Sequence, residues 1–341
     1  MKVADFDFPF DPGHIAQHPV EPRDKARLLD LSGESPTHKI IRDLPGLLQP
    51  EDLVVVNNTK VLPARLFGHR DSMAGTGGAS VAVETTLVRQ VAEDTWVALA
   101  RPGKRLKQGQ TIVFADGLDA ALIAKDGAEV TLKFNRAGPE LLTAIRTQGA
   151  MPLPPYIKRE RGGDAVDRSL YQTPFAKYEG AVAAPTASLH FTTAVRAALP
   201  CAMAEVTLHV GLGTFAGISV EDTDDHVMHV EWGELPPETA DAIAACKARG
   251  GRIVAIGTTA LRTLEAFQGQ AQAGDIDLFI TPGFDFQVVD ALLTNFHLPQ
   301  STLFMLVCAF AGAQKMKAAY ALAQEAGYRF FSYGDACWLQ R

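Results

Sequence analysis

The stretch between Val81 and Phe134 constrains the fold most, because it holds a series of short strand-like segments with no helical pattern between them. The segments are Val81–Val88, Trp96–Leu99, Thr111–Phe114, Ala121–Ala124 and Glu129–Phe134. In the last segment apolar and polar residues alternate, as in a strand with one buried face. Asp126-Gly127, just before it, is a typical hairpin sequence. Short strands in series without helices predict a small barrel or sandwich.

The rest of the chain alternates between strand-like and helix-like segments. The expected strands are Leu53–Val56, Ala204–Val210, Arg252–Ile256 and Leu278–Ile280, and helices are expected to begin at Pro236, Thr259 and Ser301. Such alternation favours an α/β sheet with helices on its faces. We therefore expect an α/β fold with a layered main domain formed by residues 1–66 and 149–341. A small antiparallel β domain, either a barrel or a sandwich and comprising residues 67–148, is expected as an insertion.

The composition is that of an ordinary folded protein. The chain has 341 residues, of which 47% are hydrophobic and 21% are charged. Its four cysteines are scattered and form no C-x-x-C pair, which suits a reducing compartment and offers no zinc framework. No secretion signal is visible at the N-terminus, and the longest apolar run, Leu303–Ala311, is too short to cross a membrane. We expect a cytoplasmic protein without a metal, and nothing in the sequence requires more than a monomer.

The net charge of −7 argues against a chain that coats nucleic acid, because phosphate contacts need local lysine and arginine. Two basic clusters are exceptions to this acidic balance. They consist of Arg101, Lys104, Arg105 and Lys107, and of Lys158 with Arg159. From composition alone, solvated loops explain these clusters equally well.

Small and hydroxyl residues follow four of the expected strands. The four segments are Asn57-Asn58-Thr59, Gly211–Phe215, Gly257-Thr258-Thr259 and Thr281–Phe284. In an α/β sheet, ligands bind beyond the carboxyl ends of the strands. One such segment is usually a mere turn. Four together predict an edge where a ligand approaches the backbone closely.

Gly257-Thr258-Thr259 leads directly into a helix, and Arg262 lies in its first turn. Because the free N–H groups of a helix N-terminus attract anions, these residues form a candidate site for a carboxylate or a phosphate. A helix cap with a surface arginine explains the same pattern. Gly211-x-Gly213 misses the spacing of a dinucleotide-binding fingerprint, and no helical pattern follows it.

Several histidines are candidates for proton transfer. In "DHVMHVEW" the apolar residues favour a strand, which would place His226 and His229 on opposite faces and argues against a metal pair. His229 and Glu231 would then share a face as an acid–base pair, or as a purely structural pair. His209 is expected to point away from the apolar face of its strand. His297 is expected in a loop held against a buried helix, a favourable place for a ligand contact.

A further segment, Gly180–Thr192, reads "GAVAAPTASLHFT" and contains no charged residue. It lacks the apolar period of an amphipathic helix, and its proline disfavours a central strand.

Long motifs in this chain resemble a known enzyme family. They include "YQTPFAKYEGAVAAPTASLHFT", "VTLHVGLGTF", "DHVMHVEW", "GTTALRTLE", "VVDALLTNFHLPQSTLFMLVCAFAG" and "YRFFSYGDA", with "NNTKVLPARLFG" and "MPLPPYIKR" in the N-terminal half. Together they are similar to the S-adenosylmethionine:tRNA ribosyltransferase-isomerases of queuosine biosynthesis. The resemblance spans nearly the whole chain and is weakest over residues 70–148. The chain departs from the family pattern at Ser188, where a glycine is expected, and at Leu212, where a smaller residue is expected.

The resemblance implies an unusual use of S-adenosylmethionine as a substrate, with no further cofactor. The family moves the ribosyl part onto 7-aminomethyl-7-deazaguanine at the wobble position of tRNA, which gives epoxyqueuosine and releases adenine and methionine. It also implies an α/β domain with an inserted β-barrel. Such chemistry needs a base of near-neutral pKa, a proton donor for adenine, an anion site for the methionine carboxylate and aromatic faces near the sulfonium.

On this reading we expect His229 with Glu231 to act as the base, and His190, His209 and His297 to donate protons or contact the purine. Arg262 with Thr258 and Thr259 is expected to hold the carboxylate. The aromatic wall is expected from Phe191, Phe215 and Phe296. The remaining substrate-contact candidates are Asn57, Asn58, Thr59, Arg65, Tyr178, Thr186, Gly211, Gly213, Thr214, His226, Gly257 and Asn295.

Two other functions stay open at this point. A conventional S-adenosylmethionine-dependent RNA methyltransferase would leave the methyl group on the RNA. A non-catalytic RNA-binding barrel would consume no S-adenosylmethionine, and the sequence lacks the basic and aromatic strand pattern typical of such barrels. On the favoured reading, the two basic clusters contact the tRNA.

Overall fold

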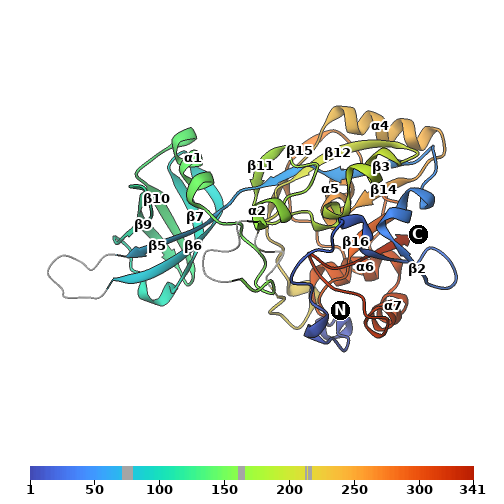
Figure 1. Ribbon diagram of the computed structural model, residues 1–341, viewed down its shortest axis with the longest axis horizontal. Coiled ribbons are helices and arrows are strands. Elements are labelled where there is room, and N and C mark those ends of the chain that lie inside the picture. Colours follow the sequence, from blue (N-terminus) through green and yellow to red (C-terminus); the bar gives the residue numbers. More distant parts are fainter. Residues whose placement is uncertain (71–79, 160–165, 212, 214–216) are drawn as a thin grey trace. The chain divides into compact units, whose positions relative to one another are not determined.

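The computed structural model describes residues 1–70, 80–159, 166–211, 213 and 217–341 (Figure 1). The chain forms two compact units, each described here by itself. The larger unit comprises Met1–Lys60, Pro155–Lys158 and Gln172–Arg341, and the smaller unit comprises Val61–Pro154 and Arg159–Tyr171. The first is an α/β layered unit and the second contains a closed antiparallel barrel, which confirms the expected fold class.

The larger unit is built on a mixed sheet. Its strands, in spatial order, are β15 (Gln272–Ile276), β13 (Glu231–Leu235), β12 (Ala202–Leu208), β3 (Leu53–Asn57), β14 (Ile253–Ile256), β16 (Ala291–Asn295), β17 (Ala336–Gln340), β1 (Arg27–Asp30) and β2 (Thr37–Ile40). The four central strands β12, β3, β14 and β16 are parallel neighbours. Their carboxyl ends therefore meet at one edge, where ligands bind in such sheets.

The two faces of this sheet bury different layers. In β3, Leu53 and Val55 face a core shared with the long helices, while Val54 and Val56 face a second core. The long helices are α4 (Pro237–Ala248), α5 (Thr258–Ala266), α6 (Thr302–Ala311) and α7 (Ala313–Glu325). The second core is covered by the short elements η4 (Ile41–Leu47), η6 (Thr186–His190) and α3 (Thr193–Ala197). A strand buried on both faces in this way has no polar side, which explains the continuous apolar run of β3.

The smaller unit contains the barrel. Its strands are β5 (Arg65–Arg70), β6 (Val81–Ala92), β7 (Thr95–Arg101), β8 (Thr111–Val113), β9 (Asp119–Asp126) and β10 (Glu129–Phe134), closed in the order β10-β7-β6-β5-β8-β9. The strands expected from the sequence are present. The predicted hairpin at Asp126-Gly127 joins β9 to β10, with Glu129 opposite Asp126. Helix α1 (Gly138–Gln148) follows the barrel and buries Leu141 and Ile145.

The other elements are short. They are η1 (Val3–Phe6), η2 (Pro12–His14), η3 (Arg23–Lys25), β4 (Thr59–Val61), η5 (Gly103–Arg105), α2 (Asp167–Leu170), β11 (Tyr178–Ala181) and η8 (Thr223–Asp225). Strands β4 and β11 pair as a separate two-stranded sheet.

Two expected strands are wrong. Leu278–Ile280 follows the end of β15 and is irregular, and the Leu278 carbonyl accepts a hydrogen bond from Arg262 Nε (3.2 Å) instead of a strand partner. The segment from His226 to Val230 is also irregular, because β13 pairs with β12 and β15 only from Glu231 onward. Leu278, Phe279 and Ile280 line a cavity, described below, together with Val227 and Met228, whereas Val230 is exposed and lies outside it.

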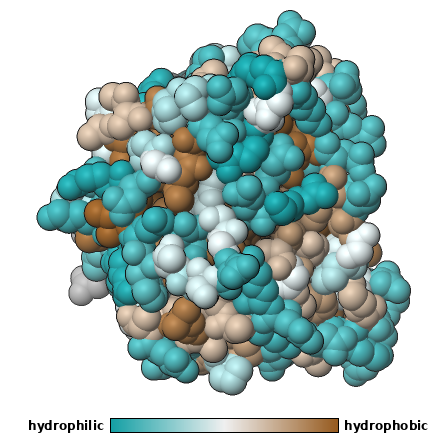
Figure 2. All heavy atoms as spheres, turned by 90° about the vertical axis from the view of Figure 1, so that its right-hand side faces the viewer, coloured by the Kyte–Doolittle hydropathy of each residue, from teal (hydrophilic) through white to brown (hydrophobic). Residues whose placement is uncertain are grey.

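The face of the molecule shown in Figure 2 is mostly hydrophilic, and the hydrophobic residues on it form small separate areas. Within the described ranges, no helix is long and apolar enough to span a bilayer.

The sharp turn after α4 depends on a glycine. A Cβ atom on Gly251 would lie 1.9 Å from the carbonyl oxygen of Glu51, which is backbone and cannot move aside. We predict that Gly251→Ala lowers the free energy of unfolding by at least about 2 kcal/mol, as overpacking does in a close-packed interior. Gly46→Ala is the matched control, because a Cβ there meets nothing within 4 Å. Equal urea-unfolding midpoints for the two variants would contradict this assignment.

Candidate active site

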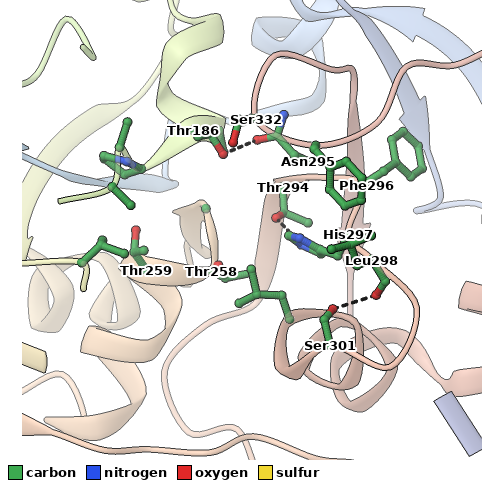
Figure 3. Close-up of a pocket in the computed structure, with 18 of the residues that line it drawn as sticks. Thr186, Thr258, Thr259, Thr294, Asn295, Phe296, His297, Leu298, Ser301 and Ser332 are labelled. Atoms are coloured by element: carbon green, nitrogen blue, oxygen red, sulfur yellow. Dashed lines mark hydrogen bonds between the residues drawn. The ribbon is translucent and has the colours of Figure 1, made fainter. Parts of the chain in front are cut away.

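A cavity lies at the carboxyl ends of β14 and β16, and we call it the edge cavity (Figure 3). Its wall combines the end of β16, the start of α5, the 183–187 segment and two aromatic residues from elsewhere in the larger unit. The lining includes Tyr156, Ala183, Ala184, Pro185, Thr186, Ala187, Gly257, Thr258, Thr259, Thr294, Asn295, Phe296, His297, Ser301, Leu303, Phe331 and Ser332. The expected fourth strand of the rim is thus β16 and not Leu278–Ile280.

Asn295, the last residue of β16, organises one side of the edge cavity. Its Oδ1 accepts a hydrogen bond from Thr186 Oγ1 (3.1 Å), and its Nδ2 lies 3.2 Å from His190 Nε2 and 3.3 Å from the Asp335 carbonyl (Figure 3). Since an amide nitrogen only donates, the His190 Nε2 accepts and the ring proton lies on Nδ1. The network fixes which atoms Asn295 and Thr186 present to the cavity.

The two buried histidines beside the edge cavity are uncharged at neutral pH. Burial, together with the nearby charges of Arg23 and Arg329, lowers the pKa of His190 to about 3. Burial lowers the pKa of His297 to about 3 as well. The His297 Nε2 lies 3.0 Å from Thr294 Oγ1, and its backbone N–H donates to the Tyr320 hydroxyl (3.1 Å). Each imidazole is therefore uncharged, which favours the expected role of contacting the purine over that of donating a proton.

The start of α5 forms another side of the edge cavity. Gly257 has φ +88°, a conformation that glycine adopts readily and other residues rarely do. Its N–H donates to the Leu293 carbonyl (2.8 Å). The turn presents Thr258 and Thr259 to the cavity. The buried Thr259 hydroxyl has no hydrogen-bond partner among the described residues. A buried hydroxyl without a partner is unusual and indicates a ligand contact.

The uncharged segment Gly180–Thr192 supplies the smooth wall of the edge cavity. Gly180 packs against the ring of His209, since a Cβ there would lie 2.7 Å from that ring. Residues 183–187 then line the cavity with three alanines, a proline and Thr186. The segment is mostly irregular, with β11 at its start and η6 near its end, in agreement with the expectation of neither a helix nor a regular strand.

A second cavity of about 400 Å³, here called the arginine cavity, lies between β13, α5 and the N-terminus of α6. Its lining includes Gly213, Ser219, Val220, Asp225, His226, Met228, His229, Glu231, Arg262, Leu278, Phe279, Ile280, Thr302, Leu303 and Leu306. Leu303 lines both cavities. Arg262 therefore belongs here, whereas Thr258 and Thr259 border the edge cavity, so the expected trio is divided between two sites.

Arg262 and Glu231 form a buried ion pair in this cavity. Arg262 Nη1 lies 2.5 Å from Glu231 Oε2, and the side chains are only 7% and 4% exposed. The other oxygen of Glu231 accepts the Gly211 N–H (2.8 Å). Glu231 thus connects α5 to the loop after β12, and both of its oxygens are occupied. This arrangement favours a positioning role for Glu231 over the expected role in a catalytic base pair.

The histidines of the "DHVMHVEW" motif both line the arginine cavity, so the expectation that they point to opposite sides is wrong. His229 is exposed and its ring packs against the backbone of Gly213, where a Cβ would lie 2.3 Å from the ring. His226 packs edge-on against Phe279, with ring centroids 5.1 Å apart. Burial and the neighbouring His229 lower the pKa of His226.

The comparison with known proteins decides the family. A family model described as "Queuosine biosynthesis protein" matches residues 3–339. The chain belongs to this family.

Relatives of known name agree with the queuosine-biosynthesis assignment. A protein from Maricaulis maris is 51% identical over 351 residues, covering 100% of this chain and 99% of the relative. One from Rhodospirillum rubrum is 52% identical over 345 residues, covering 98% and 97%. Both are named S-adenosylmethionine:tRNA ribosyltransferase-isomerase. A crystal structure of an S-adenosylmethionine tRNA ribosyltransferase from Thermotoga maritima covers 98% of this chain and 99% of its own, with 35% identity and a TM-score of 0.54.

Some residues expected from the queuosine-family resemblance lie outside both cavities. The buried side chain of Asn57 bonds to the backbone of Leu208 and to the Thr59 N–H. That of Asn58 bonds to Glu205 and Thr207. These two asparagines join β3 to β12 and thus position the edge without lining it.

His209 and Thr59 form a pair beside this junction. Thr59 Oγ1 lies 2.8 Å from His209 Nδ1, and the ring stacks on Trp232 with centroids 5.3 Å apart. Burial lowers the pKa of His209. The side chain is therefore held between two partners and does not point freely into solvent.

Three further expected contacts are placed elsewhere. Phe191 is buried in the second core, edge-on to Phe175, and does not wall a cavity. Arg65 belongs to the smaller unit and pairs with Glu84 (2.5 Å). Tyr178 is exposed on β11. Phe296 does line the edge cavity, although its ring is buried among aromatic neighbours.

The basic residues expected to contact RNA also differ in their surroundings. Arg101, Lys104, Arg105 and Lys107 are all exposed on the barrel, as is Lys158 on the larger unit. Arg159 instead forms a buried ion pair with Asp167 in the smaller unit, with Nε and Oδ2 2.9 Å apart. Its guanidinium is occupied there, and we leave it out of the RNA-contact set.

Leu212, Thr214 and Phe215 lie outside the described residues. Ser188 is fully buried, lines neither cavity, and its hydroxyl has no hydrogen-bond partner in the described part of the chain. Reasoning from the sequence missed Tyr156 and Ser332, whose hydroxyls lie 2.8 Å apart at the edge cavity. Both stand within quoted family motifs, "MPLPPYIKR" and "YRFFSYGDA", which was the available signal. No cluster of three or more metal-ligating side chains occurs in the described ranges.

The buried histidines make stability depend on pH. Their pKa values are about 3 in the folded protein, below the ordinary value of 6.5. Above pH 6.5 neither state binds the proton. As the pH falls below 6.5 only the unfolded state binds it, so each histidine lowers the free energy of unfolding by about 1.4 kcal/mol per pH unit until about pH 3.

We therefore predict that His297→Asn reduces the slope of unfolding free energy against pH by about 1.4 kcal/mol per pH unit between pH 6 and 4.5. Urea unfolding at several pH values measures the slope, which is independent of the absolute loss of stability. The control is His18→Asn at an exposed position. An unchanged slope in His297→Asn would show that this imidazole titrates normally in the folded protein.

Proposed function

We propose that this protein is an S-adenosylmethionine:tRNA ribosyltransferase-isomerase of queuosine biosynthesis. The observation that carries the proposal is the family match across residues 3–339, joined by relatives of about 50% identity that align over nearly their whole length. These relatives bear the names of ribosyltransferase-isomerases and not of methyltransferases. The proposed substrates are S-adenosylmethionine and a tRNA that carries 7-aminomethyl-7-deazaguanine at the wobble position.

The reaction follows from the charge on sulfur. A sulfonium acidifies the neighbouring ribose carbon, so that a base removes a proton there. The C–H electron pair breaks the adjacent ring C–O bond to form an alkene, and the freed ring oxygen becomes an aldehyde as it expels adenine, which takes up a proton. The tRNA amine then adds to the alkene and loses a proton, and the carbanion formed beside sulfur closes on the aldehyde. The resulting alkoxide displaces sulfur to form the epoxide, which breaks the carbon–sulfur bond and expels methionine. The tRNA supplies the nucleophile, so the protein needs only a base, hydrogen-bond donors and binding groups.

The arrangement of the cavities supports a division of these roles. His229 is the base in this proposal, because it is exposed in the arginine cavity and lies against Gly213. The nucleoside part lies toward the edge cavity, where Thr259 has an unused hydroxyl and Thr186 and Asn295 are fixed by hydrogen bonds. His190 holds Asn295 in place and His297 holds Thr294, each as an uncharged ring.

The exposed basic residues of the barrel, Arg101 to Lys107, and Lys158 are the proposed contacts to tRNA phosphates. A local basic patch on a chain of net charge −7 keeps the affinity moderate, which suits an enzyme that must release a modified tRNA. We further propose that the protein acts as a cytoplasmic monomer.

The fate of two labels tests the proposed function. With S-adenosylmethionine labelled in the methyl group and in the ribose, precursor-bearing tRNA should acquire only the ribose label. The methyl label should leave with methionine, and free adenine should appear in equal amount. A methyl label on the RNA would indicate a methyltransferase. Binding of tRNA without consumption of S-adenosylmethionine would indicate a non-catalytic binder.

The proposed base makes a separate prediction. His229→Gln should lower kcat for adenine release about 100-fold or more, because general base catalysis contributes at least that factor. His38→Gln is the control, since His38 bonds to the Tyr328 hydroxyl and lines neither cavity. Undiminished turnover in His229→Gln would remove this residue from the mechanism.

A further inference from the structure

The arginine cavity holds a cationic donor that the fold leaves unused. Arg262 is 6% exposed, its Nη1 binds Glu231, and its Nε donates to the Leu278 carbonyl. Its Nη2 is buried and has no hydrogen-bond partner among the residues that the structure describes. Leaving a donor of a charged group unsatisfied costs more than leaving a neutral buried polar group unsatisfied. A guanidinium held in this way indicates an anionic ligand, whose oxygen would accept from Nη2.

The N-terminus of α6 borders the same cavity. Thr302 and Leu303, the first two helical residues, both line it, and Ser301 caps the helix by accepting the Phe304 N–H (3.1 Å). A helix supplies no acceptors for the N–H groups of its first turn, and its dipole favours negative charge there. The helix and the buried guanidinium are independent features, and both favour an anion in this cavity.

The remaining lining is that of a site for an amino acid with an apolar side chain. Met228, Ile280 and Leu306 supply apolar surface, and Asp225 supplies a carboxylate that complements an ammonium group. Phe279 and His226 supply rings, whose faces attract a cation such as a sulfonium.

We propose that the arginine cavity binds the amino-acid end of S-adenosylmethionine, with its carboxylate between Arg262 Nη2 and the N-terminus of α6. The nucleoside end then passes Leu303, the residue common to both cavities, toward the edge cavity. This placement rests on the proposed function. It replaces the expectation from the sequence that Thr258 and Thr259 share the carboxylate with Arg262.

Decarboxylated S-adenosylmethionine tests the placement in the unaltered protein. Binding of the two ligands is measured by calorimetry without tRNA. The carboxylate should strengthen binding about 10- to 100-fold, the usual effect of charge-assisted hydrogen bonds. Equal affinity for both ligands would overturn the proposal. Adenine release with tRNA, measured separately, would then still report whether the proposed function holds.

Variants locate the carboxylate within the cavity. Arg262→Gln should abolish the preference for the carboxylated ligand, but it leaves Glu231 buried without a partner and endangers folding. Thr302→Glu avoids this difficulty, since an acidic residue in the first turn stabilises a helix. It should lower the affinity for S-adenosylmethionine at least about 10-fold. The affinity for the decarboxylated ligand should stay unchanged or increase.

Thr302→Gln is the matched control, with the same size and no charge. It reports the effect of the larger side chain alone, so the effect of the charge is the difference between the two variants. If Thr302→Glu weakens both ligands equally, or neither, the carboxylate does not bind at this helix and the placement is wrong.

Discussion

The parallel alignment of β12, β3, β14 and β16 is the constraint on which the rest of the structure depends. It brings segments that lie far apart in the sequence, after residues 57, 208, 256 and 295, to one edge of one sheet. The side chain of Asn57 continues the hydrogen bonding from β3 to β12 where the regular ladder ends. The turn at Gly257 then connects β14 to α5, which packs on the sheet, so that Thr258 and Thr259 at the helix start face the edge. Thr258, Thr259 and Asn295 derive their positions from this alignment.

The two cavities that meet at Leu303 differ in their charged groups. In the arginine cavity, Arg262 and Glu231 are both buried and neutralise one another, and Glu231 also holds the Gly211 loop. Taking two charges out of water is costly unless both are well bonded. The pair therefore fixes the positions of the two side chains and is not a general source of stability. Around the edge cavity, neutral histidines, an asparagine and threonines provide hydrogen bonds without net charge. One compartment is thus suited to a charged group and the other to a polar uncharged one.

Much of the fold could be predicted from local patterns. The buried run of β3, the series of barrel strands and the apolar helix α6 carry strong signals, because their periodicity reflects burial directly. Leu278–Ile280 and His226–Val230 misled this reasoning, because their apolar residues line a cavity or lie exposed, and a short apolar run does not distinguish these cases from a buried strand. Strand β5 was missed because it begins with Arg65 and contains Gly68, which packs closely against Val113 of β8. The motifs identified the site residues as a set. They could not show that Arg262 and Thr258 face different cavities, because residues four apart on a helix share a face and therefore predict a common site.

The low pKa values of His190 and His297 determine which interactions the edge cavity offers to a ligand. Both rings stay uncharged across the physiological range, because burial and, for His190, the nearby arginines disfavour the imidazolium form. The nucleoside that we propose for this cavity therefore meets hydrogen-bonding groups and no full charge from these imidazoles. Its recognition there should not change as the pH moves through the neutral range.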